Sequence, residues 1–227
     1  MSKVKELRVS VISARIANRF VKKHHYSGKV TPNSQLHFGV YLNGVLHGAM
    51  SFGPGIDKRK MMRLIKGTQW NEFLELNRLA FDDILPRNSE SRALAIVMRL
   101  IRRNAPQIKW VVSFADATQC GDGTIYRASG FVLTSIKKNS QMLRLSDGSI
   151  VAGKSLDNPN HQAPNGAYGR GDALKNGAEY LPGYQLRYIY FLDPDERKNL
   201  TCEEIPFAEI AKRGAAMYKG VRLASVV

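Results

Sequence analysis

Three consecutive stretches decide the fold: FLELNRLAF at residues 73–81, SESRALAIVMRLIRRN at 89–104 and WVVSFA at 110–115. The first is rich in strand-favouring residues, with polar side chains between apolar ones. The second places apolar residues at helical spacing and arginines on the opposite side, which predicts an amphipathic helix. The third is nearly all apolar, a pattern typical of a buried central strand. Together they predict a β-α-β unit.

The sequence before this unit predicts a strand, a helix and a hairpin. Residues 7–12 have strand character, and Ser13 can cap a helix that runs towards His24 and ends at Gly28. Asn43-Gly44 separates two β-rich runs and favours a two-residue hairpin turn. We expect the further elements to be a hairpin over 36–42 and 45–52, a short basic helix or loop at 57–66, helices at 123–129 and 207–218, and strands at 131–136 and 184–192.

The order of these elements predicts an α/β (α+β) fold in which one mixed β-sheet is flanked by helices. We expect one catalytic domain over residues 1–193 and a basic C-terminal extension over 194–227. An irregular insertion is expected at about 146–183, because Gly, Asn, Pro and Asp replace any periodic apolar pattern there. An insertion of that length without secondary structure is usually functional or mobile.

The charge of the chain points to a polyanionic partner. Lys plus Arg is 34 and Asp plus Glu is 19, so 34 − 19 gives a net charge of +15. Nucleic acid is the first candidate and an anionic membrane surface the second, while an ordinary basic enzyme is the alternative. No apolar window is long enough for a membrane span, and the N-terminus lacks a signal-peptide pattern. Two isolated cysteines, Cys120 and Cys202, indicate a reducing cytosol rather than a disulfide framework or zinc site.

Four residues, at three places in the chain, carry side chains suited to acid–base chemistry. His25 and Tyr26 follow the first helix and can supply a titratable base or a metal ligand, although solvated surface residues are the alternative. Asp116 stands at the carboxyl end of the buried strand, where open α/β sheets place their sites, and the alternative is a cap of the next turn. Tyr126 offers a phenol as general acid, unless it is a core tyrosine.

Two further stretches suit the binding of an acyl donor. Glu75, Asn77 and Arg78 give a polar face to what should be a central strand, which would line a donor cleft if that face is not solvated. The segment 86–93 opens the long helix, and a helix N-terminus binds anions. The element order resembles the GCN5-related N-acetyltransferases, in which this segment binds a pyrophosphate. Here it lacks their glycines, and Arg87 and Arg92 could instead be a solvated helix start.

The combination of motifs at residues 25–26, 75–81, 91, 114–116 and 123–131 resembles the phage-encoded Mom family of DNA-modifying enzymes. The resemblance covers roughly residues 20–145. It implies that the chain converts adenine in double-stranded DNA to N6-(carbamoylmethyl)adenine and so protects phage DNA from host restriction in the bacterial cytoplasm. It also implies a catalytic or metal-proximal cluster and a donor-binding set. The first contains His25, Tyr26, Asp116 and Tyr126, and the second contains Arg78 and Ser91, with Arg87 and Arg92 at the helix start.

The donor and the chemistry stay open between two routes. Glycyl-tRNA would support acyl transfer to N6 followed by rearrangement. Acetyl-CoA would need a redox metal, for which His25, Asp116 and Tyr126 could ligate iron. The competing functions are a non-catalytic nucleic-acid-binding protein and an ordinary N-acetyltransferase. A membrane partner is not expected, and the oligomeric state, a dimer included, is left open.

Because N6 lies inside the duplex, the adenine must leave the stack. Tyr26 and Phe52 are candidates to stack on it, with core packing as the alternative for Phe52. Phosphate contacts are expected from a set of basic side chains that read no sequence. The set consists of Lys58, Arg59, Lys60, Arg63, Lys66, Arg102, Arg103, Lys137 and Lys138.

Overall fold

The computed structural model describes residues 7–55, 57–158 and 169–223. The chain divides into two compact units, each described by itself below. Unit 1 comprises Met1–Phe114, Gly123–Ser135 and Arg187–Phe207, and unit 2 comprises Ala115–Asp122, Ile136–Leu186 and Ala208–Val227. Among the described helices, none is long and apolar enough to cross a membrane.

The main sheet has seven strands in the order β1-β2-β3-β4-β5-β10-β6. The first four pair antiparallel, whereas β4 and β5 pair parallel, so the sheet is mixed, as predicted. The strands are β1 (Arg8–Val11), β2 (Leu36–Leu42), β3 (Val45–Gly53), β4 (Phe73–Phe81), β5 (Trp110–Ala117), β6 (Val132–Lys138) and β10 (Tyr184–Phe191).

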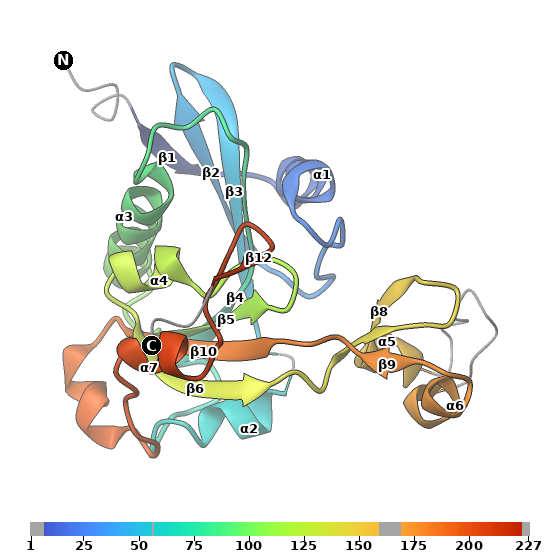
Figure 1. Ribbon diagram of the computed structural model, residues 1–227. Helices are drawn as coiled ribbons and strands as arrows, with labels where there is room; N and C mark the ends of the chain where they lie inside the picture. Colours follow the sequence, from blue (N-terminus) through green and yellow to red (C-terminus); the bar gives the residue numbers. More distant parts are fainter. Residues whose placement is uncertain (1–6, 56, 159–168, 224–227) are drawn as a thin grey trace. The chain divides into compact units, whose positions relative to one another are not determined.

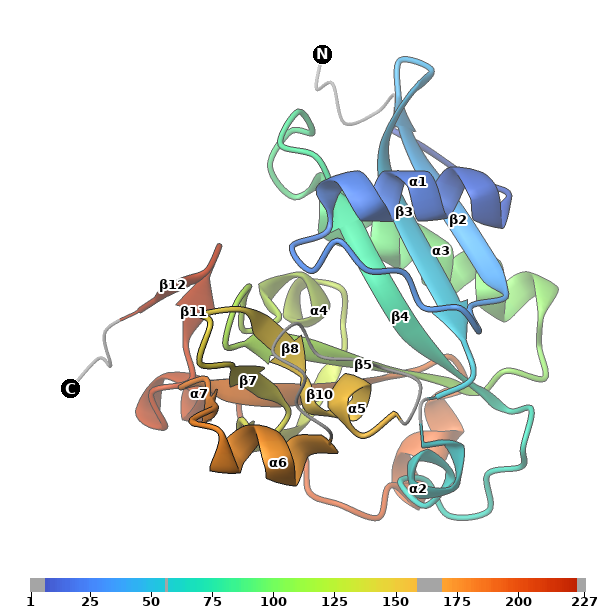
Figure 2. The same cartoon turned by 90° about the vertical axis from the view of Figure 1, so that its right-hand side faces the viewer.

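Two helices cover opposite faces of strands β1–β4 in unit 1, α1 (Ala14–His24) on one side and α3 (Ser89–Asn104) on the other (Figures 1 and 2). Ser13 caps α1 by accepting a hydrogen bond from the Ile16 N–H. The apolar face of α1, with Ala17, Phe20 and Val21, packs on alanines of β3 and β4, whereas Ile16 is 41% exposed. The mixed sheet flanked by helices is therefore confirmed.

The predicted hairpin and the β-α-β unit are also confirmed. Asn43 and Gly44 both have positive φ, 51° and 79°, as a two-residue hairpin turn requires. β4 and α3 have the expected bounds. The register between β3 and β4 shifts, however, because Ser51 pairs with Arg78 whereas Phe52 pairs with Leu76. Asn77 is the extra residue of this β-bulge, which alternation along the sequence does not reveal.

A second part of the unit 1 core lies around Trp110, whose ring stacks on Phe73 with centroids 4.6 Å apart. Met61 and Met62 of helix α2 (Lys58–Met62) pack against this cluster. So does Leu200, which follows the 3-10 helix η2 (Pro194–Asn199). Backbone hydrogen bonds tie the two flanking segments together, since Lys66 N–H donates to the Asn199 carbonyl and Thr201 N–H to that of Leu64.

Unit 2 contains secondary structure where the composition suggested irregular chain. A three-stranded sheet has the order β8-β7-β9, and two short helices accompany it. An apolar cluster that includes Leu143, Leu156 and Ala173 holds them together. Residues 159–168 of the expected insertion lie outside the described residues. The elements are β7 (Met142–Arg144), β8 (Ile150–Ala152), α5 (Gly153–Leu156), α6 (Gly169–Lys175) and β9 (Glu179–Tyr180).

Near the C-terminus the helix predicted over 207–218 is wrong in extent. α7 covers only Ala208–Lys212, and Gly214 follows with φ +63°. The chain then forms a small hairpin of β11 (Met217–Tyr218) and β12 (Val221–Arg222). The apolar residues after Gly214 thus belong to extended chain, which a helical count could not distinguish.

We expect Gly123→Ala to destabilise the protein more than Gly67→Ala. Both glycines have φ near +85°, which costs an L-residue about 1–2 kcal/mol. A Cβ at Gly67 meets open space, whereas at Gly123 it would lie 2.5 Å from the Tyr188 ring. Gly123→Ala should therefore lower the free energy of unfolding by about 2 kcal/mol more than Gly67→Ala does. Urea unfolding measures the difference, and equal losses for the two variants would show that the ring moves freely.

Candidate active site

The loop after α1 brings His25 and Tyr26 together. The helix ends at His24, and His25 is already extended, so Gly28 does not end it as predicted. The two rings lie 4.4 Å apart, centroid to centroid, and Tyr26 is 49% exposed. His25 Nδ1 accepts a hydrogen bond from the Ser27 N–H at 3.2 Å and lies 2.8 Å from Ser27 Oγ. Because Nδ1 is an acceptor, we assign the proton of neutral His25 to Nε2.

Arg78 of β4 anchors this loop. Its Nε donates to the Lys29 carbonyl at 2.7 Å and Nη1 to the Asn77 carbonyl at 2.6 Å. Burial lowers the pKa of the guanidinium, and the nearby Tyr26 and Glu75 side chains raise it. Arg78 stays charged, because the pKa of arginine starts far above neutrality. The structure thus places His25, Tyr26 and Arg78 in one site of unit 1.

The bulge residue Asn77 makes the second tether of the same loop. Ser34 Oγ donates to Asn77 Oδ1 at 2.9 Å, while Asn77 Nδ2 is buried without a hydrogen-bond partner among the described residues. Glu75 is also buried. Its carboxylate packs against Gly55, since a Cβ added to that glycine would lie 3.4 Å from Glu75 Oε2. The site therefore combines a buried carboxylate, an amide and a guanidinium on one strand.

Two site residues were missed by the sequence reasoning, His37 of β2 and Ser51 of β3. Cross-strand pairing aligns them with Arg78 in one row across three strands. His37 Nδ1 lies 2.9 Å from Ser51 Oγ, and both side chains are buried. Burial lowers the pKa of His37 and so favours the neutral imidazole, whereas a hydrogen bond with the Ser34 backbone has a smaller, opposite effect on that pKa. In the sequence, only their polar character within two mostly apolar hairpin strands could have indicated His37 and Ser51 as site residues.

Tyr126 belongs to unit 1 but lies in its core. It is 8% exposed, on helix α4 (Thr124–Ala128), and its ring contacts those of Phe131 and Tyr188 with centroids 5.4 and 5.2 Å away. Packing thus fixes its position. The ring is therefore that of a core tyrosine, the alternative given above, and the role of the Tyr126 hydroxyl as general acid stays a prediction.

Asp116 lies in unit 2, where it organises a turn. Its Oδ1 accepts hydrogen bonds from Thr118 N–H at 3.0 Å, from Thr118 Oγ1 and from Gln185 Nε2 at 2.7 Å, and Oδ2 accepts from Gln119 Nε2 at 3.2 Å. The Asp116 carbonyl accepts from Cys120 and Gly121 N–H. The predicted alternative, a cap of the next turn, matches these contacts, and the catalytic role stays a prediction.

Of the predicted donor residues, Arg78 lies on β4, whereas Arg87, Ser91 and Arg92 lie at the start of α3. Ser91 Oγ donates to the Asn88 carbonyl at 3.2 Å, and Arg87 and Arg92 are exposed. Asn88 has left-handed φ and caps nothing with its side chain, while Ser89 Oγ is buried without a hydrogen-bond partner in the described part of the chain. The first-turn N–H groups and the two arginines could hold an anionic group there.

The predicted iron ligands are His25, Asp116 and Tyr126. Across 7–55, 57–158 and 169–223, no three His, Cys, Asp or Glu side chains gather as a metal site. Nδ1 of His25 is occupied by Ser27, and the oxygens of Asp116 by Thr118 and its neighbours. The described residues therefore give no support to the iron hypothesis.

The predicted phosphate-binding residues are exposed except Lys58, which packs over the Trp70 ring with its Nζ 3.9 Å from the ring centroid. Burial lowers the pKa of Lys58. Phe52, predicted to stack on the base, is fully buried, which leaves Tyr26 as the accessible ring of that pair. The outer face of α1 adds four exposed cations, Arg15, Arg19, Lys22 and Lys23.

Comparison with solved structures finds N-acetyltransferases. The spermidine/spermine N-acetyltransferase SpeG of Vibrio cholerae aligns with 87% of this chain and 99% of its own, at 10% identity and a TM-score of 0.46. The ribosomal-protein-S18-alanine N-acetyltransferase of Escherichia coli aligns with 82% of this chain and 94% of its own, at 9% identity and a TM-score of 0.44.

Comparison of sequences is more specific. The model of the Mom protein family matches residues 6–209. A relative from Escherichia phage Mu, named methylcarbamoylase mom, is 34% identical over 200 residues, which are 88% of this chain and 81% of the relative. The chain belongs to the Mom protein family. The resemblance stated from the motifs is therefore confirmed.

We expect Asp116→Ala to destabilise the protein by roughly 1–3 kcal/mol, because half-buried donors of Thr118 and Gln185 lose their acceptor. Asp116→Asn should cost less, since its amide oxygen can still accept. Thr118→Val, which removes only the hydroxyl donor, is the matched control and should cost about 1 kcal/mol. Urea unfolding tests the order. Wild-type stability of Asp116→Ala would show that the turn does not depend on this carboxylate.

Proposed function

We propose that the chain attaches a carbamoylmethyl group to N6 of adenine in double-stranded DNA, and so shields phage DNA from restriction in the host cytoplasm. The observation that carries the proposal is the 34% identity, over 88% of the chain, to a methylcarbamoylase. The net charge of +15 supports a polyanionic substrate. The site around Arg78 supports an enzyme rather than a binding protein alone.

Simple acetyl transfer cannot yield the product, because it would leave a carbonyl on N6. In the favoured route, N6 attacks a glycyl ester and forms N6-glycyladenine, and the donor alkoxide leaves. N6 loses one proton and the alkoxide gains one, so the step balances. The free glycyl amine then attacks C6 through a five-membered ring. The bond from C6 to the original nitrogen breaks, and that nitrogen becomes the terminal amide. The second step is an isomerisation, so it needs no oxidant.

The residues of unit 1 can support the first step electrostatically. The guanidinium of Arg78 and the Nε2–H of His25 are donors suited to the oxyanion that develops on the glycyl carbonyl. Tyr126 would protonate the leaving alkoxide, and Asp116 would accept the proton of N6. Tyr26, half exposed beside His25, is placed to stack on the displaced adenine.

The donor is proposed as glycyl-tRNA, with acetyl-CoA as the second candidate. Both carry phosphates, and the start of α3 with Arg87, Ser91 and Arg92 would bind them. An acetyl donor would supply two carbons but no amide nitrogen and would need an oxidation. The glycyl donor already contains every atom of the C2H3NO addition, which is why we prefer it.

We expect bacteria that express the chain to contain a deoxyadenosine heavier by C2H3NO. Mass spectrometry of nucleosides from their DNA measures it, and Tyr126→Phe should remove the adduct without loss of the folded state, which circular dichroism checks. With purified protein, glycyl-tRNA should support the reaction and acetyl-CoA should not. DNA without the adduct would refute the function, whereas activity with acetyl-CoA alone would refute only the donor.

We expect Arg59→Gln with Arg63→Gln to weaken binding of every duplex sequence about equally. Each arginine is exposed in the predicted phosphate-binding set, so the slope of log K against log salt should fall by about 2. Lys198→Gln with Lys212→Gln is the control of equal net charge, because these lysines already pair with Asp195 and Glu209. Fluorescence anisotropy measures the slopes. Loss confined to one sequence would contradict a phosphate role.

A further inference from the structure

Trp70 is an unusually exposed tryptophan. It lies in the turn before β4, and 59% of its surface is accessible even though Lys58 Nζ sits over the ring at 3.9 Å. The other tryptophan, Trp110, is fully buried and stacks on Phe73. An indole exposed to this extent has no packing role that would account for it, and exposed rings of this size are typical of binding surfaces.

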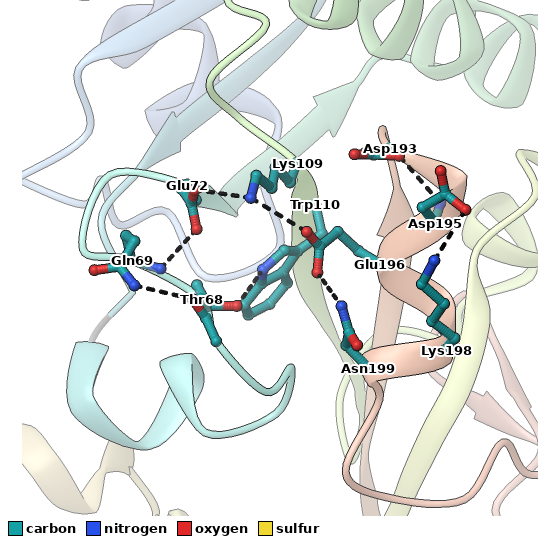
Figure 3. Close-up of polar contacts among 11 residues, drawn as sticks. Thr68, Gln69, Glu72, Lys109, Trp110, Asp193, Asp195, Glu196, Lys198 and Asn199 are labelled. Atoms are coloured by element: carbon teal, nitrogen blue, oxygen red, sulfur yellow. Dashed lines mark hydrogen bonds and ion pairs between the residues drawn. The ribbon is translucent and has the colours of Figure 1, made fainter.

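The turn that carries Trp70 is held rigidly on both sides (Figure 3). Thr68 Oγ1 accepts from Trp110 Nε1 at 3.1 Å, and Glu72 accepts from the Gln69 N–H at 2.7 Å. Lys109 bridges Glu72 at 2.9 Å and Glu196 at 3.2 Å. The ring is therefore presented on a fixed backbone, so binding through it loses little conformational freedom.

The charges of this carboxylate–lysine bridge are stable at neutral pH. Burial raises the pKa of Glu72, but the hydrogen bonds from Lys109 and the Gln69 N–H outweigh it, so the pKa is lowered overall. Hydrogen bonds to Glu72 and Glu196 raise the pKa of Lys109. Both partners thus stay ionised, and the turn keeps its shape under the conditions in which DNA is bound.

Lys58, whose Nζ lies over the Trp70 ring, begins a basic segment of the chain. Arg59, Lys60 and Arg63 belong to α2 or follow it, and Lys66 precedes the turn, all of them exposed. Aromatic rings between cations are the combination that binds single-stranded nucleic acid, because the cations hold phosphates and the ring stacks on bases. A surface of this kind on a duplex-modifying enzyme suits the place where strands are parted.

We propose that Trp70 is a stacking platform for an unpaired base of the DNA substrate. The inference rests on the proposed function, which requires a base to leave the duplex. Glu75 of the site is five positions after Trp70, so at most about 18 Å of chain lies between them, a few base steps at about 3.4 Å each. The platform therefore lies within a few nucleotides of the site on β4.

Intrinsic fluorescence reports this contact directly. We expect a duplex with one unpaired adenine to quench the emission of the wild-type protein, and the same duplex fully paired to quench it less. In Trp70→Phe the remaining emission comes from buried Trp110 and should not change on binding. Anisotropy of labelled DNA confirms saturation in each titration.

Affinity gives the second readout. Trp70→Ala should bind the duplex with the unpaired adenine about tenfold more weakly, and Trp70→Phe should keep most of the affinity. Phe207→Ala is the matched control, since Phe207 is also an exposed ring of unit 1 with a cation, Arg127, 5.9 Å from its centroid. It should bind as the wild type does.

Three results would overturn the proposal: no quenching at saturation, wild-type affinity of Trp70→Ala, or quenching by tRNA and not by DNA. A shift of oligomeric state in Trp70→Ala, measured by sedimentation, with no change in DNA binding would assign the ring to a protein contact instead. Failure of the proposed function is distinguishable, because it shows as absence of the adenine adduct in cells expressing the wild type. The fluorescence result does not depend on that adduct.

Discussion

The β-bulge at Asn77 is the constraint on which the candidate site depends. A regular strand would send Asn77 and Arg78 to opposite faces. The extra residue lets both tether the loop between α1 and β2, Asn77 through Ser34 and Arg78 through the Lys29 carbonyl. That loop also carries His25 and Tyr26. The chemistry of unit 1 is thus positioned by one irregularity in an otherwise regular antiparallel pair.

The elements of unit 1 were predictable because their signals are local. Asn43-Gly44 has the backbone conformation its turn requires, and the apolar spacing of residues 89–104 matches the buried face of α3. The β-bulge at Asn77 was not predictable, since the sequence of residues 73–81 predicts a strand whichever of them is left unpaired. For the same reason, the alignment of His37 and Ser51 with Arg78 depends on register, which sequence alone does not supply.

The roles given to the site residues stay predictions, although the structure brings some of these residues together. His25, Tyr26 and Arg78 come together because a loop and a strand meet. Tyr126 sits in the core, where an apolar neighbourhood and a catalytic one look alike from composition. In unit 2, short strands of two or three residues lie below the length at which periodicity is measurable, so the region resembled irregular chain.

A count of hydrogen bonds separates the roles available to His25 and Asp116 in the proposed reaction. The Ser27 N–H points at His25 Nδ1, which disfavours a proton there and makes the imidazole a donor through Nε2. A carboxylate has about four lone-pair sites, and Asp116 already accepts from Thr118 twice, from Gln119 and from Gln185. Three of these donors bond Oδ1 and one bonds Oδ2, so a substrate donor would compete with the contacts of the turn. In the proposed reaction, unit 1 would therefore stabilise negative charge, and a base role of Asp116 would compete with the hydrogen bonds that hold its turn.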